Sequence, residues 1–142
     1  MTVKEAKAIL EKNAGCAEDS LIDSLHECEL FSKKRFWEFY DCVISLAQVA
    51  LKSGRDFETA RKITLVYQRI LKEMVWHFDK RDLSKLRKFP NKRYNSYIER
   101  LDNAVDAYFR GVFVDETLFE LQRPGGRTNG LVGMYGKGVL YL

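Results

Sequence analysis

Histidine, the side chain used most often for acid–base catalysis, is scarce in this sequence. His26 and His77 are its two histidines, and each lies in text of helical periodicity beside apolar neighbours. Glu27 or Asp79 could orient an imidazole, and a lysine or arginine could stabilise a phosphorane, so a two-histidine nuclease is chemically conceivable. Because nothing in the spacing demands that reaction, we expect no catalytic residue and a protein that is not an enzyme.

The cysteines are the other candidates for site chemistry. Cys16, Cys28 and Cys42 could join His26 around a metal ion, but the sequence contains no Cys-x-x-Cys pair. We therefore expect no metal and no cofactor. An odd number of cysteines in helix-like text favours reduced, buried thiols over a disulfide framework.

The C-terminal text "GRTNGLVGMYGKGVLYL" is rich in glycine and could be mistaken for a phosphate-binding loop. It fails the Walker pattern, because Leu131 stands where the first glycine should be and Gly138 follows Lys137 in place of Ser or Thr. The order of glycines also differs from the dinucleotide-binding pattern, so we expect no small-molecule substrate here. "LVGMY" and "VLYL" instead flank Gly136–Gly138 as two strands flank a hairpin turn. Docking on the helical body, addition to a partner's sheet and disorder remain open for this hairpin.

The basic stretch "KRDLSKLRKFPNKRYNSY", residues 80–97, is the most specific surface feature of the sequence. Residues 79–100 carry eight Lys and Arg against three Asp and Glu, a net charge of +5, whereas residues 1–30 carry a net charge of −4. Oppositely charged faces can steer charged partners. The residues predicted to bind a partner are Arg81, Lys85, Arg87, Lys88, Lys92, Arg93, Tyr94 and Tyr97.

Three interpretations of this stretch remain open. Its cations could follow phosphates while Phe89, Tyr94 and Tyr97 stack on bases, which favours nucleic-acid binding. The same cations could meet an acidic protein, or they could be a solvated corner. Tyr94 and Tyr97 also fit the apolar stripe of a helix, which counts against base stacking.

The elements that must position these residues are helices with recognisable ends. Thr2 and Glu5 form a capping-box pattern, and Ser32, Asp56 and Asp115 are further N-cap candidates. Pro90 disfavours helix just before it, so residues 83–88 form at most a short helix. The expected helices cover residues 2–13, 19–30, 32–53, 56–78, 91–110 and 115–121.

These elements predict a mainly α fold: a single domain over residues 1–142, built as a bundle of four to six helices with a small C-terminal β-hairpin over 123–142. The 46% hydrophobic and 31% charged content suits a packed core. No apolar run reaches the length of a membrane span, and the first residues mix both charge signs, so we expect a cytoplasmic protein without a membrane partner.

The text "RLDNAVDAYFRGVFVDETLFELQ", residues 100–122, is similar to the end of small α-helical bacterial immunity proteins, which neutralise colicin-like or contact-dependent toxins. The shared features are Leu-Asp and Ala-x-x-Ala-Tyr-Phe elements in a helix, a glycine stop and a short Asp-capped helix. The resemblance implies a non-enzymatic protein that binds a toxin domain and blocks its active site or substrate entry. Members that face basic nuclease sites tend to be acidic, which would make the acidic N-terminal third the contact.

Overall fold

The computed structural model describes residues 1–125 and 139–140. Three long helices begin at the N-caps that the sequence predicts, whereas the helix expected from residue 91 begins at Tyr94, after Arg93, which forms no side-chain cap. The side-chain oxygens of Thr2, Ser32 and Asp56 each accept the backbone N–H three residues on. The elements are α1 (Val3–Ala14), α2 (Leu21–His26), α3 (Lys33–Ser53), α4 (Phe57–Phe78), α5 (Tyr94–Arg110), β1 (Phe113–Val114), the 3₁₀ turn η1 (Glu116–Leu118) and β2 (Val139–Leu140). The predicted mainly α bundle is confirmed.

The prediction for residues 19–30 was wrong in length. Helix α2 has six residues, and the chain leaves it at Glu27 because the following segment pairs with a distant one. Phe31 N–H donates to the carbonyl of Arg87 at 3.0 Å, and Arg87 N–H donates to the carbonyl of Glu29 at 2.7 Å. Residues 29–31 are therefore held against the α4–α5 connection, with an isolated parallel bridge between Leu30 and Arg87.

The prediction of buried thiols holds for one cysteine of three. Cys42 lies in α3 and is fully buried, and burial raises the pKa of its thiol to about 12. Cys16 and Cys28 are exposed, because one follows the end of α1 and the other lies in the segment that leaves α2.

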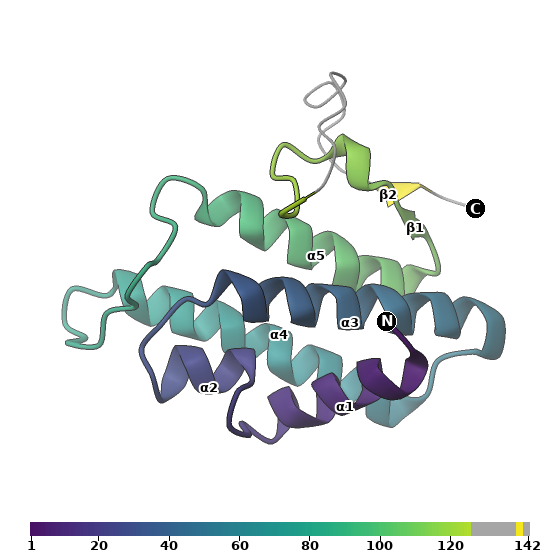
Figure 1. The fold of residues 1–142 in the computed structure, drawn as a ribbon, viewed down its shortest axis with the longest axis horizontal. Helices are drawn as coiled ribbons and strands as arrows, with labels where there is room; N and C mark the ends of the chain where they lie inside the picture. Colours follow the sequence, from purple (N-terminus) through teal and green to yellow (C-terminus); the bar gives the residue numbers. More distant parts are fainter. Residues whose placement is uncertain (126–138, 141–142) are drawn as a thin grey trace.

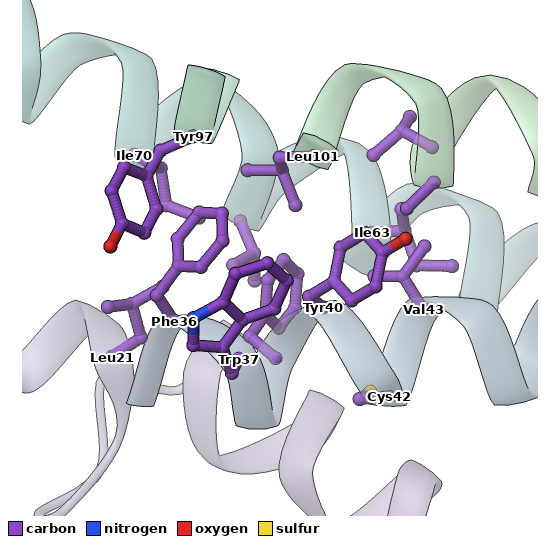
Figure 2. Packing of buried hydrophobic residues seen from close by; sticks show 14 of the residues in the cluster. Leu21, Phe36, Trp37, Tyr40, Cys42, Val43, Ile63, Ile70, Tyr97 and Leu101 are labelled. Atoms are coloured by element: carbon purple, nitrogen blue, oxygen red, sulfur yellow. The ribbon is translucent and has the colours of Figure 1, made fainter. Parts of the chain in front are cut away.

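The core is built around α3, which packs against α1 on one side and α5 on the other, while α4 packs against α1, α2 and α5 (Figure 1). Figure 2 shows Phe36, Trp37 and Tyr40 of α3 pointing toward Tyr97 and Leu101 of α5. The Phe36 and Tyr97 rings meet edge to face with centroids 4.9 Å apart. One continuous apolar cluster thus joins all five helices.

The end of the chain returns to the segment that follows α5. Gly111, with φ +68°, ends α5, and β1 then pairs antiparallel with β2 so that Phe113 faces Leu140 and Val114 faces Val139. Asp115 caps a 3₁₀ turn, shorter than the predicted helix through Leu121. The other predicted hairpin strand, residues 131–135, and its turn lie outside the described residues.

Among the helices of the described ranges, none combines the length and apolar composition that crossing a bilayer requires.

Candidate partner-binding surface

The basic stretch forms the connection between α4 and α5, and α4 holds it in place. The backbone N–H of Leu86 donates to Nδ1 of His77 at 2.9 Å, and the Leu86 side chain is buried. The Lys85 ammonium donates to the carbonyls of His77 at 2.9 Å and Asp79 at 2.7 Å, which satisfies the last turn of α4. Residues 79–93 are thus fastened to α4 at two points.

His77 acts in this arrangement as a structural acceptor. Burial lowers the pKa of its imidazole, Lys85 lowers it further, and a hydrogen bond with Asn91 opposes the shift. A neutral ring can accept the Leu86 N–H through Nδ1, whereas a protonated ring cannot. The ring also lies against Phe89 with centroids 4.2 Å apart. His77 therefore fixes the loop and offers no free general base.

The cations of the connection fall into two groups. The first group has partners within the protein: Lys85 donates to the carbonyls at the end of α4, Arg87 Nη2 donates to the carbonyl of Cys28 at 3.0 Å, and Arg81 Nε lies 3.6 Å from Asp79. Within residues 1–125, no carboxylate forms an ion pair with the remaining exposed cations of this region: Lys33, Lys34, Lys80, Lys88, Lys92 and Arg93. We call these six side chains, together with Arg81, Lys85 and Arg87, the basic end. It lies at the left of Figure 1, where the α2–α3 and α4–α5 connections meet.

The aromatic residues of the stretch face inward. Tyr97 is 4% exposed and lies between Phe31 and Phe36, with centroids 5.2 and 4.9 Å away, so it presents no ring to a partner. Burial raises the pKa of its phenol. Phe89 is also buried, and Tyr94 is half-buried, 4.9 Å from Phe78. The structure brings the predicted cations together on the surface and places Tyr97 in the core.

An exposed leucine was missed by the sequence reasoning. Leu83 is 96% exposed within the connection, and Phe78 is half exposed at the end of α4. Leu83 belongs to no helical stripe, so its exposure could be found only by knowing that residues 79–93 form a loop. It gives the basic end an apolar contact point.

A second charged centre lies in the core, and it was also missed. Arg100 of α5 is wholly buried: Nε donates to the carbonyl of Leu121 at 2.9 Å, and Nη1 donates to Tyr40 Oη at 3.0 Å and to the Glu116 carboxylate. Its guanidinium lies 4.1 Å from the Phe119 ring. Burial raises the pKa of Tyr40. The sequence contained a signal for the burial of Arg100, because this residue follows Tyr97 by three positions and so lies on the apolar stripe of α5.

His26 belongs to a network that joins α2 to α4. Its Nδ1 lies 3.0 Å from Oε1 of the buried Glu73 and 2.9 Å from Nη2 of Arg69, and Arg69 Nε donates to the same Glu73 oxygen at 3.2 Å. Depending on the tautomer, Nδ1 either donates to Glu73 or accepts from Arg69, and in both cases it links α2 to α4, while Nε2 lies 3.8 Å from Glu27. Across the described ranges, no group of three or more His, Cys, Asp or Glu side chains is arranged to hold a metal ion.

The fold and the surface define a small, mainly helical protein whose described residues form five α-helices with a positively charged end. Comparisons with protein-family models, with curated proteins and with solved structures found no match to this chain. Its function is therefore argued from its own geometry.

Proposed function

We propose that this chain is a non-enzymatic protein-binding module whose basic end docks on an acidic surface of a partner protein. The observation that carries the proposal is Leu83, 96% exposed in a loop whose neighbouring cations Lys80 and Lys88 have no carboxylate partner in the described residues. Protein interfaces combine an apolar anchor with a polar or charged rim, and complementary charge accelerates association.

The class of partner that we propose is a bacterial toxin domain, met in the cytoplasm. The support is the resemblance of residues 100–122 to immunity proteins. In this fold those residues form the second half of α5, β1 and η1, around the buried Arg100, so they belong to the scaffold. The resemblance supports the kind of protein and leaves the interface to be located from the surface, which favours a toxin with an acidic patch.

Nucleic-acid binding by residues 80–97 is the second candidate, and the unpaired cations favour it. The inward orientation of Phe89 and Tyr97 counts against it, because stacking platforms for bases must be exposed. The two candidates differ in their response to salt: phosphate binding weakens steeply with ionic strength, whereas a packed protein interface loses mainly association rate.

The test is capture from the native host's lysate, with and without nuclease, using wild type, Leu83→Asp and the control Leu65→Asp. Leu65 is an exposed leucine of α4, distant in sequence from the basic end. We expect one stoichiometric protein, retained after nuclease, on wild type and Leu65→Asp and lost on Leu83→Asp. Capture of RNA or DNA that nuclease removes would replace the proposal with the second candidate.

A captured protein then tests the toxin class directly. Expressed alone, it should arrest growth, and co-expression with this chain should relieve the arrest, whereas co-expression with Leu83→Asp should not. A captured protein without toxicity would remove the immunity interpretation and leave protein binding in place.

A further inference from the structure

A hollow of about 530 Å³ opens beside the basic end, between the segment that enters α3 and the segment that precedes α5. Leu30, Phe89 and Pro90 contribute apolar surface to it, and Lys33 and Lys88 contribute cations from opposite walls. The two walls are held together by the hydrogen bonds between Phe31 and Arg87 and between Arg87 and Glu29. The hollow is therefore a built feature of the fold.

The charged residues that line this hollow are both cations. Lys33 and Lys88 are exposed, and neither is paired with a carboxylate in the described part of the chain. The nearest acid in sequence, Glu29, accepts the Ser84 hydroxyl at 3.1 Å. Helix α3 has no acid in its first turn, where acids are favourable and lysines are not. The positive end of the α3 dipole repels Lys33, and an acidic group of a partner would offset this repulsion.

The floor of the hollow suits an aliphatic or aromatic side chain better than a base. The Phe89 ring is covered by His77, 4.2 Å away, and by Tyr94, 5.9 Å away in a stacked arrangement. Phe31, which also lines the hollow, is 1% exposed. No ring face is thus open for base stacking, and ammonium groups are point charges that pair readily with carboxylates.

We propose that this hollow binds an acidic peptide segment of the partner, with one large apolar side chain against Leu30 and Pro90 and flanking carboxylates paired with Lys33 and Lys88. This inference rests on the proposed function and names the chemistry that the basic end recognises. Leu83 does not line the hollow, so the two contact points can be tested separately.

The experiment is selection of displayed random peptides of about 16 residues, a length suited to groove recognition, against the folded full chain. Enriched peptides should carry a Phe, Trp, Leu or Ile flanked on both sides by Asp or Glu. Lys33→Glu/Lys88→Glu should weaken their binding at least about tenfold, equivalent to about 1.4 kcal/mol. The control Lys52→Glu/Lys72→Glu reverses two exposed lysines of α3 and α4 away from the hollow and should bind within about twofold of wild type.

Several outcomes would overturn the inference: no enrichment, enriched peptides without acids or without an apolar residue, or equal binding by Lys33→Glu/Lys88→Glu. Stronger binding of single-stranded DNA than of the selected peptides, dependent on the same lysines, would assign the hollow to nucleic acid. Lys33→Glu places an acid in the first turn of α3, where the helix dipole favours negative charge. We therefore expect the variant to fold, and an unchanged Tm would show that its loss of binding does not come from misfolding.

The Leu83→Asp variant separates the two proposals. It should bind the selected peptides as wild type does while losing the captured partner. If peptide binding fails but capture dependent on Leu83 persists, only the hollow inference falls. If capture by wild type fails, the proposed function falls.

Discussion

Arg100 and the basic end place the same kind of charge in opposite surroundings. Arg100 is wholly buried and is surrounded by acceptors and rings from α3 and from the segment that follows α5. The cations Lys80, Lys88, Lys92 and Arg93 are exposed and have no carboxylate partner in residues 1–125. A buried charge stabilises a fold only through its partners, whereas exposed charges contribute little to stability and remain available for binding.

The Arg100 centre extends toward the surface through a second guanidinium. Arg123 forms an ion pair with Asp41, and its guanidinium carbon lies 5.8 Å from the Trp37 ring, while that of Arg100 lies 5.3 Å from the same ring. These contacts fix the turn after α5 onto α3. The two regions thus differ in role: one holds α5 and the segment that follows it against α3, and the other faces solvent.

The largest effect that we predict is the loss of stability in Arg100→Met. The change leaves the carbonyl of the buried Leu121 and the Tyr40 hydroxyl without their donor, so the free energy of unfolding should fall by about 2 kcal/mol, the scale for a buried polar group left unsatisfied. Chemical denaturation measures it. Arg61→Met, which removes an exposed pair with Glu58, should change the free energy by less than about 0.5 kcal/mol. Equal losses of stability in the two variants would contradict the difference that we draw between the buried and the exposed arginine.

A smaller effect, of opposite sign, is predicted for Lys88→Gly. Lys88 has φ +55°, a region that costs a non-glycine residue about 1–2 kcal/mol and glycine little. The entropy of glycine offsets part of the gain, so stability should rise by about 0.5–1 kcal/mol while binding of acidic peptides weakens. Glu29→Gly, at φ +48°, should give a similar gain without weakening binding. Stronger peptide binding by Lys88→Gly would contradict the role given to this lysine.

The smallest effect concerns pH. Because burial lowers the pKa of His77 in the folded chain, the unfolded chain binds a proton more readily, so the stability that His77 contributes is complete above about pH 6.5 and falls as the pH drops below it. Protonation removes the acceptor of the Leu86 N–H. The hydrogen-exchange protection factor of the Leu86 amide should therefore decrease in mild acid. That of Arg35, whose amide donates to Ser32 Oγ, should not, and parallel decreases would rule out the His77 contact as the cause.

The sequence predicted those parts of the fold that depend on local signals. Thr2, Ser32 and Asp56 marked helix starts, and Gly54 and Gly111 marked ends, because capping chemistry acts within a few residues. The short α2 could not be predicted, since it ends where residues 29–31 pair with Arg87, more than fifty positions away.

The candidate site was predicted in part for the same reason. The cations of residues 80–97 could be read as a surface group from composition. The burial of Tyr97, the exposure of Leu83 and the contribution of Lys33 and Lys34 depend on contacts between segments distant in sequence. The position of Arg100 on the apolar stripe of α5 indicated, from the sequence alone, that its charge is buried.

The central claim is that the cations of the basic end without a carboxylate partner in residues 1–125 serve binding and not folding. The measurement that tests it most directly is the Kd of the captured partner beside the free energy of unfolding, for wild type and for a variant with Lys80, Lys88, Lys92 and Arg93 all changed to Glu. We predict that the Kd rises at least about a hundredfold while the free energy of unfolding changes by less than about 1 kcal/mol. An unchanged Kd, or a variant that no longer folds, would contradict the account.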